Sequence, residues 1–453
     1  MQTFDLIVIG AGSGLNVSSA AADRGMKVAI VEKGPMGGTC LNRGCIPSKI
    51  IIHSADVAET IKKSKLFGIN SKINSIDFAK ITSRASNLVD KEAEEIEEAI
   101  IEDKNTTLFK TEAKFIGERT LKVGKETIKG NKVIIAAGTR PSVPPIDGLS
   151  EVDFVTSDEA LRLKKQPKTM TILGGGYIAA ELAHFYGALG TKVNVIHRRK
   201  YLIPNEDEEI SRKFTEVFSK KYNILTEHNA TKVSKRRNKF IVIAENKKSN
   251  KKLVSDQLLV AAGRIPNTDI LDVGKTNVET DEKGFIKTNE YLETTSKNIW
   301  ALGDIVGKYL FKHSANLEAQ YVYYNAILNK KVKIDYNAMP HAIFSSPQIA
   351  GVGLREQDLK DKKVDYAVGR YEFIKSGMGL AMQDNEGFVK IFADKKTRRI
   401  LGCHILGTDA STLIHEVIVA MKAGLTADSI QNAVHVHPAL SEVVQRAVNN
   451  IEW

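Results

Sequence analysis

Apolar runs that alternate with glycine-rich turns predict the main elements of this chain. The opening segment DLIVIGAGSG predicts a buried strand and a tight turn, LNVSSAAADRG predicts a helix of small residues, and VAIVEK predicts a second strand. The same order returns in TMTILGGGYIAAELAHFYGALGTKVNVIH. The sequence therefore predicts two strand, turn and helix units of the kind that bind dinucleotides.

The first unit carries the residues expected to hold an adenosine diphosphate group. Gly10, Gly12 and Gly14 let the backbone approach a pyrophosphate at the helix N-terminus, and Glu32 ends the second strand, where a carboxylate binds a ribose diol. Leu15 stands where the third glycine of the pattern is expected. Either the helix and strand pack farther apart there, or the leucine points away.

The second unit differs at the residue that would bind the ribose. Gly174 and Gly176 occupy its turn, but His197 replaces the acid and is followed by Arg198 and Arg199. Guanidinium groups bind a 2′-phosphate, which a carboxylate would repel. The sequence therefore favours NADPH, with NADH still possible, and the alternative is a solvated basic turn.

Two of the three cysteines lie close together, directly after the first unit. Cys40 and Cys45 are separated by four residues in GGTCLNRGCIPSK, so their sulfur atoms can meet. A disulfide that closes so small a ring is expected to be reducible and therefore catalytic, and the alternative is a pair of buried free thiols. Cys403 lies in an apolar alternating run and is expected to be inert core.

Length and composition limit the class of protein. With 453 residues, 42% of them hydrophobic and 26% charged, the chain is expected to form two or three globular domains. The net charge of +11 is densest over residues 231–253, but the alternation in KFIVIAE predicts a strand hairpin with lysine-rich edges, so nucleic acid is not expected as a partner. The few cysteines, the absence of a long apolar stretch and an N-terminus that predicts a strand favour a cytoplasmic protein without a membrane partner.

Taken together, these motifs resemble the flavin-dependent pyridine nucleotide disulfide oxidoreductases, the family of dihydrolipoamide dehydrogenase, glutathione reductase and mycothione reductase. The similarity includes GGTCLNRGCIPSK, AAGTRP at 136–141, AAGRIPNT at 261–268, ALGD at 301–304 and HVHPALSE at 435–442. The resemblance implies an α/β fold with two Rossmann-like domains and a C-terminal α+β dimerisation domain. The expected division is an FAD-binding domain of residues 1–147 and 270–335, an NAD(P)-binding domain of residues 148–269, and an interface domain of residues 336–453.

The resemblance also implies roles for individual residues. Cys40 would exchange with substrate and Cys45 would lie against the flavin. Lys49 would approach the flavin and pair with Glu181, Asp304 would bind the ribityl chain, and Tyr177 would cover the flavin until the nicotinamide arrives. Further residues expected at the cofactor sites are Lys33, Gly38, Thr39, Ala113, Gly138 and Gly263. No metal site is expected.

Histidine is suited to move protons during thiol exchange near neutral pH. His437 stands out among the histidines, because Pro438 favours the first position of a helix and Glu442 follows close behind. Taken alone, a histidine beside a proline is more often a surface residue, and it is the resemblance that implies that His437 is the base and Glu442 its carboxylate partner. His435 is a supporting candidate. The resemblance implies a homodimer in which His437 reaches the cysteine pair of the partner chain.

The activity expected is electron transfer from NADPH through FAD and the cysteine pair to a small disulfide. Oxidation of dihydrolipoamide with NAD is the first alternative, because HVHPALSE resembles the dihydrolipoamide dehydrogenase ending. A flavin NAD(P)H oxidase and a flavin-binding subunit without activity remain further alternatives. The absence of an additional cysteine pair disfavours the mercuric reductase and thioredoxin reductase branches.

Overall fold

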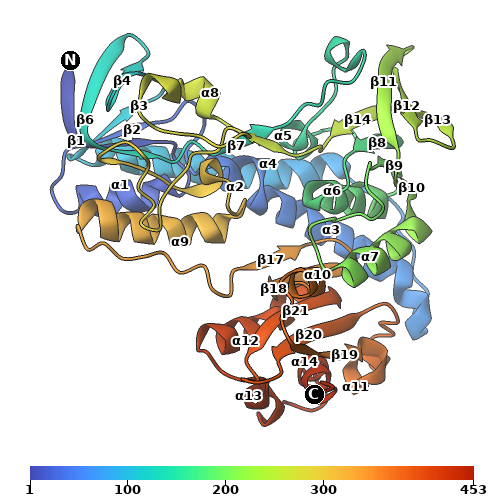
Figure 1. The fold of residues 1–453 in the computed structure, drawn as a ribbon. Coiled ribbons are helices and arrows are strands. Elements are labelled where there is room, and N and C mark those ends of the chain that lie inside the picture. Colours follow the sequence, from blue (N-terminus) through green and yellow to red (C-terminus); the bar gives the residue numbers. More distant parts are fainter.

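Parallel strands form the centre of the first sheet in this computed structural model, which describes residues 1–453 (Figure 1). In spatial order they are β3 (Thr106–Phe109), β2 (Val28–Val31), β1 (Gln2–Ile9), β6 (Glu126–Ile135) and β16 (Ile299–Ala301). The last four residues of β1 are buried, as its unbroken apolar run predicted for a strand covered on both faces. Two antiparallel strands, β5 (Thr120–Val123) and β4 (Ala113–Gly117), extend the sheet beside the start of β6.

Helices pack around this sheet. They are α1 (Gly14–Ala22), α2 (Gly38–Arg43), α3 (Cys45–Lys63), α4 (Phe78–Glu102) and α9 (Lys312–Val322). Helix α1 follows the glycine turn directly and packs against α9, although the two are far apart in sequence (Figure 1). The start of α9 therefore lies near the glycine turn, at the edge where ligands of open α/β sheets bind.

The second sheet repeats the first on a smaller scale. Its parallel strands are, in spatial order, β10 (Asn223–Leu225), β9 (Lys192–Ile196), β8 (Thr169–Leu173) and β14 (Gln257–Val260). Helix α6 (Tyr177–Ala188) follows the glycine turn after β8, and α7 (Glu208–Lys221) connects β9 to β10. This arrangement is the second strand, turn and helix unit that the sequence predicted.

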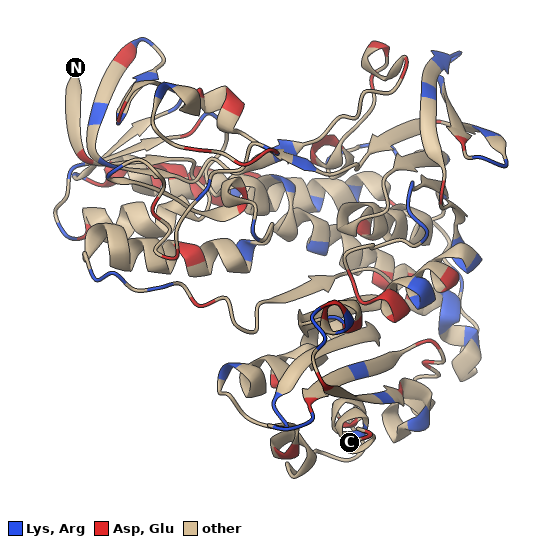
Figure 2. Cartoon of the chain, in the orientation of Figure 1, with Lys and Arg blue, Asp and Glu red and all other residues tan.

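The basic stretch forms a separate antiparallel sheet of β11 (Asn229–Arg236), β12 (Lys239–Glu245) and β13 (Asn250–Ser255). The KFIVIAE segment is the central strand, and its alternate residues are buried, as the pattern predicted. Lysine and arginine cluster at its outer turn and along its edge, as Figure 2 shows. These positions match the expected protection of strand edges by charge.

The chain crosses between the two parallel sheets twice, at neighbouring places. The short strands β7 (Thr139–Pro141) and β15 (Arg264–Pro266) pair antiparallel, so the outgoing and returning segments lie side by side. The domain boundaries given above, with the first domain split in sequence, remain a proposal.

An antiparallel sheet makes up the C-terminal part of the molecule (Figure 1). Its order is β17 (Pro340–Ile343), β18 (Gln348–Gly353), β21 (Ile400–Gly407), β20 (Phe388–Asp394) and β19 (Tyr366–Glu372). The helices around it are α12 (Ala410–Lys422), α13 (Ala427–Gln431) and α14 (Glu442–Asn449). Cys403 is fully buried on the central strand β21, as predicted for a core residue. The predicted α/β class with a C-terminal α+β part is confirmed, and no helix has the length and hydropathy of a membrane span.

Candidate active site

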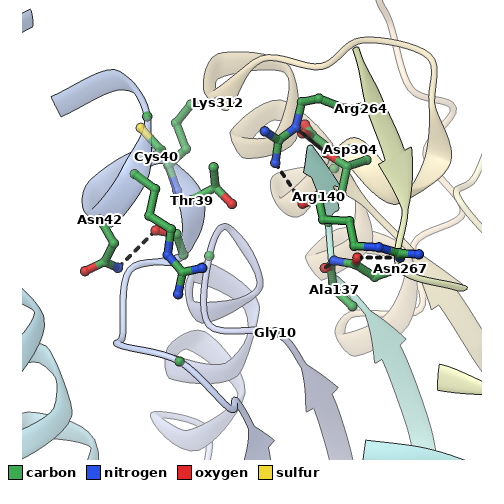
Figure 3. Close-up of a pocket in the computed structure, with 18 of the residues that line it drawn as sticks. Gly10, Thr39, Cys40, Asn42, Ala137, Arg140, Arg264, Asn267, Asp304 and Lys312 are labelled. Carbon is green, nitrogen blue, oxygen red and sulfur yellow. Dashed lines mark hydrogen bonds and ion pairs between the residues drawn. The ribbon is translucent and has the colours of Figure 1, made fainter. Parts of the chain in front are cut away.

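A cavity of about 490 Å³ opens at the carboxyl edge of the first sheet (Figure 3). The cavity is lined by several segments from the first 182 residues, together with β15 and the start of α9. The predicted site residues that line it are Gly10, Gly12, Glu32, Lys33, Gly38, Thr39, Cys40, Cys45, Lys49, Ala113, Gly138, Tyr177, Glu181 and Asp304. The fold thus gathers most of the sequence-predicted residues into one site.

The first glycine turn passes so close to neighbouring backbone that a side chain would not fit at Gly10. Gly10 has φ +102°, and a Cβ atom there would lie 2.3 Å from the carbonyl oxygen of Ala136. A Cβ on Gly14 would lie 2.8 Å from Val8, so Gly14 provides the close contact between helix and strand. The helix therefore does not pack farther away, and Leu15 lies half-buried against the neighbouring core.

Glu32 is held across the glycine turn by backbone hydrogen bonds. Its carboxylate accepts the N–H of Ala11 at 2.9 Å and the N–H of Gly34 at 2.7 Å. A carboxylate oxygen has further acceptor capacity beyond one such bond, so Glu32 can still bind a diol. The position fits a ribose beside the pyrophosphate that the turn would hold.

The two cysteines lie on either side of a helix break. Cys40 is in α2, Cys45 begins α3, and Gly44 between them has φ −142° and ψ −114°, which ends the first helix. The buried Asn42 side chain donates to the carbonyl oxygens of Met36 and Gly38 at 2.7 and 3.0 Å and fixes this segment. Both thiols are free in this structure, and their side chains are hydrogen bonded to each other.

The surroundings favour a thiolate on Cys45. The hydrogen bond from Cys40 and the charge of Lys49 outweigh burial and lower the pKa of Cys45 to about 7. The same hydrogen bond, with burial, raises the pKa of Cys40, although the charge of Lys312 acts in the opposite direction. The first negative charge of the pair therefore rests on Cys45.

Lys49 joins α3 to α6 through an ion pair. Its Nζ atom lies 2.8 and 2.9 Å from the two carboxylate oxygens of Glu181. Glu181 also accepts the backbone N–H of Phe344 at 3.0 Å, and the Lys49 ammonium lies 4.4 Å from the centre of the Phe344 ring. The lysine is thus held with its charge next to the cysteine pair.

Tyr177 and Asp304 lie on other walls of the cavity. Tyr177 begins α6 and stacks on Phe311, with ring centres 5.6 Å apart, and burial raises the pKa of its hydroxyl. Asp304 accepts the hydroxyl of Thr139 at 2.9 Å, and burial raises its pKa against the effect of the charge of Arg264. An aromatic ring and a carboxylate thus lie on different sides of one cavity.

The glycine residues of the second unit lie outside this cavity. Gly174 has φ +129°, and a Cβ atom there would lie 2.1 Å from the carbonyl oxygen of Ala261, which repeats the contact of Gly10 with Ala136. The other predicted members of the unit are Gly176, Arg198, Arg199 and Gly263, and the two arginines are exposed beyond β9. The exposed guanidinium groups are available to an anionic ligand.

His437 lies on the surface, away from the cavity of its own chain. Its side chain is 73% exposed, and its Nδ1 atom lies 3.0 Å from Glu442. The expectation that Pro438 begins a helix is wrong, because α14 starts at Glu442, directly before the buried apolar stripe that begins with Val443. His435 pairs instead with Glu416 at 3.0 Å.

Several cavity residues were not predicted from the sequence. Lys312 donates to Ser13 at 3.0 Å and lies near Cys40, and Phe311 stacks on Tyr177. Arg264 donates to Thr139 at 2.7 Å within the crossing strands. Arg264 could have been found, because it follows the AAG repeat; nothing in the local pattern marks Lys312 or Phe311.

The cavity fits an FAD. Gly138 has φ +62° and no heavy atom within 4 Å of the place where a Cβ would lie, so bare backbone faces open space there. Gly38 approaches Gly12 so closely that a Cβ on Gly38 would lie 2.7 Å from the Gly12 Cα. Backbone surfaces of this kind, with Glu32 and Asp304 lining the same cavity, suit a long dinucleotide. With the adjoining thiols and a second nucleotide unit, they define a flavin-dependent disulfide oxidoreductase.

Comparison with known proteins gives the same class. The family model of pyridine nucleotide-disulphide oxidoreductases matches residues 4–319, and that of their dimerisation domain matches residues 339–448. The chain belongs to this family, its cofactor is FAD, and the dimerisation domain supports a homodimer.

Similar relatives cover the full chain. Mycothione reductase of Mycobacterium tuberculosis is 35% identical over 460 residues, which is 99% of each chain. Dihydrolipoyl dehydrogenase of Bacillus subtilis is 33% identical over 450 residues, covering 98% of this chain and 95% of the relative. Among solved structures, the HOCl-induced flavoprotein disulfide reductase RclA from Escherichia coli superimposes with a TM-score of 0.87 at 27% identity over 99% of both chains.

Proposed function

We propose that this flavoprotein uses NADPH to reduce a small disulfide through the Cys40 and Cys45 pair. The observation that carries the proposal is the Cys45 thiol of lowered pKa, which shares one cavity with Lys49 and the glycine turn. The likeness to mycothione reductase favours a low-molecular-weight disulfide as substrate. Oxidation of dihydrolipoamide is the second candidate, and the likeness to dihydrolipoyl dehydrogenase favours it.

The cofactor would be held by residues from several segments. Gly10, Gly12 and Gly14 would form the turn under the pyrophosphate, Glu32 would accept the adenosine ribose and Asp304 the ribityl chain. Other proposed contacts are Lys33, Gly38, Thr39, Ala113 and Gly138. Bound FAD would supply the electron transfer between the nicotinamide and the thiols.

NADPH would bind the second unit. Gly174, Gly176 and Gly263 would allow close approach of the nucleotide backbone, and Tyr177 would move aside to admit the nicotinamide. Arg198 and Arg199 are exposed at the end of β9, and they are proposed to bind the 2′-phosphate.

The thiols would exchange with the substrate in two steps. The sulfur of Cys40 gives its proton to His437 of the partner subunit and attacks one sulfur of the substrate, so that a mixed disulfide forms and the first thiolate leaves. The Cys45 thiolate then attacks the Cys40 sulfur, which forms the Cys40 to Cys45 disulfide and releases the second thiolate. The partner subunit's His437, held by Glu442, returns its proton to a leaving thiolate.

The test is an anaerobic titration of the oxidised enzyme with NADPH, followed by a panel of disulfides and lipoamide. We expect a long-wavelength absorbance from the Cys45 thiolate beside the flavin, and turnover that Cys40→Ser abolishes. Cys403→Ser is the matched control, because that thiol is buried in the C-terminal sheet. Full turnover by Cys40→Ser would contradict the proposal and favour a flavin oxidase, and a rate with dihydrolipoamide and NAD that exceeds every disulfide would favour the second candidate.

A further inference from the structure

Two histidines and a glutamate meet in a part of the molecule that the proposed reaction does not use. Glu206 lies just before α7, His341 is in β17 and His404 is in β21. One ligand atom from each residue lies within 4.8 Å of the other two. Glu206 and His404 are almost fully buried, whereas the His341 side chain is 18% exposed. The cluster therefore connects the second nucleotide unit to the C-terminal sheet.

The strand register explains why the two imidazole rings converge. His341 on β17 and His404 on β21 both pair with Gly351 on the strand between them. A Cβ on Gly351 would lie 2.5 Å from His341 Cε1 and 2.7 Å from His404 Nδ1. Directly paired residues lie on the same face of a sheet, so the missing side chain of Gly351 makes room for both rings.

The hydrogen bond of His404 Nε2 determines whether Nδ1, the nitrogen that faces Glu206, carries a hydrogen. His404 Nε2 lies 3.1 Å from the carbonyl oxygen of Leu354, which can only accept, so Nε2 carries a hydrogen. A neutral His404 then turns the lone pair of Nδ1 toward the Glu206 carboxylate. A metal ion at this place would take the position of the proton that otherwise lies between Nδ1 and the carboxylate. A histidine whose outer nitrogen donates to a carbonyl is the usual arrangement of a metal ligand.

The nearby buried lysine is engaged elsewhere. Lys390 Nζ lies 3.1 Å from Asp207, 3.2 Å from Glu209 and 2.7 Å from Glu356. The Glu206 carboxylate instead contacts the two imidazoles and accepts the backbone N–H of Asp207 at 2.7 Å. Its charge is thus directed at the two rings, where either protons or a metal ion can balance it.

We propose that Glu206, His341 and His404 form a binding site for Zn²⁺. Two imidazole nitrogens and one carboxylate oxygen are a donor set that zinc accepts, with a fourth position left for water. Bonds of about 2.1 Å in a tetrahedron set the donor atoms roughly 3.4 Å from one another. Each imidazole nitrogen must therefore move away from the Glu206 oxygen that it now contacts. The partly exposed His341 ring can make this adjustment at the edge of the sheet. This site departs from the sequence-based expectation of no metal.

The bound ion would hold two parts of the chain together. Glu206 belongs to the segment between β9 and α7, whereas both histidines belong to the C-terminal sheet. The His341 ring also stacks parallel to Tyr177, with ring centres 6.3 Å apart. Occupancy of the site is therefore expected to stabilise the junction beside the proposed nicotinamide gate.

The test measures zinc on the purified flavoprotein in its oxidised form, because a reduced cysteine pair would itself bind the metal. After incubation with excess Zn²⁺ and dialysis, mass spectrometry of the metal is expected to give one zinc per chain. The matched variants are His341→Gln, which removes a partly exposed ligand, and His415→Gln, which removes an exposed histidine outside the cluster. We expect His341→Gln to lose the zinc and His415→Gln to retain it.

Thermal unfolding gives a second measurement that does not depend on activity. Zinc is expected to raise the unfolding temperature of the unchanged protein and of His415→Gln, and to leave that of His341→Gln unchanged, because only the intact site binds the folded state selectively. An unfolding temperature of His341→Gln near that of the zinc-free unchanged protein shows that the variant is folded. Equal zinc content in His341→Gln and the unchanged protein, or no zinc retained by either, would overturn the proposal.

Discussion

The charge of Lys49 beside Cys45 leads to a prediction whose sign can be tested. Lys49→Met removes the ammonium and leaves Glu181 facing the thiol, and both changes disfavour the thiolate. An opposite charge at close range shifts a pKa by about 1 to 3 units. The pKa of Cys45 is lowered to about 7 by the hydrogen bond from Cys40 and by the charge of Lys49 together, so Lys49 accounts for only part of the change. We therefore expect the pKa of Cys45 to rise by about one unit.

The assay follows the thiolate absorbance beside the flavin in two-electron-reduced enzyme as pH changes. At pH 7.5 the thiolate fraction is expected to fall from about three quarters to about one quarter. Glu181→Gln is expected to shift the midpoint the other way, because the carboxylate raises the pKa of Cys45. Lys312→Met is the matched control, since that lysine acts on Cys40. A midpoint in Lys49→Met at or below that of the unchanged enzyme would refute this reasoning.

Three further predictions concern the first glycine turn, the second nucleotide unit and the subunit interface. Gly10→Ala is expected to cost about 2 kcal/mol and to lower the flavin content of purified protein, measured by unfolding and absorbance, because of its positive φ and the nearby carbonyl; Gly176→Ala, which meets open space, is the control. Arg199→Ala is expected to lower kcat/KM for NADPH about tenfold or more and leave that for NADH unchanged; equal losses would remove the preference for NADPH. Mixed dimers of Cys40→Ser and His437→Gln chains are expected to regain roughly a quarter of full activity if sites are shared across a twofold interface; no recovery would place the base elsewhere.

Local patterns predicted those elements whose structure is determined by the residues of one short segment. The unbroken apolar run of β1 and the glycines after it specify a buried strand and a turn without reference to the rest of the chain. Cys40 and Cys45 could be paired for the same reason, since only four residues separate them. Contacts of this kind depend on backbone geometry over a few residues.

Residues brought together from distant segments could not be predicted in this way. Lys312 is 299 residues from Ser13, with which it forms a hydrogen bond, and Glu206 is 198 residues from His404. Their proximity depends on how the helices and sheets pack against one another, which no local pattern reports. The start of α14 could not be predicted for a related reason, because Pro438 suits a helix start but the buried apolar stripe begins only at Val443.

The two predicted nucleotide units share one backbone arrangement at their glycine turns. Gly10 and Gly174 both have positive φ, and a Cβ on either would clash with the carbonyl of an AAG segment, at Ala136 and Ala261. The units differ at the end of the second strand, where Glu32 accepts backbone N–H groups and faces the cavity, whereas His197 is buried with its ring against Gly175. Because the His197 ring is buried, the exposed Arg198 and Arg199 are the groups proposed to meet the ribose. If the second unit binds NADPH as proposed, the difference in cofactor depends on this strand-end position, and the shared turn would let both units hold a dinucleotide.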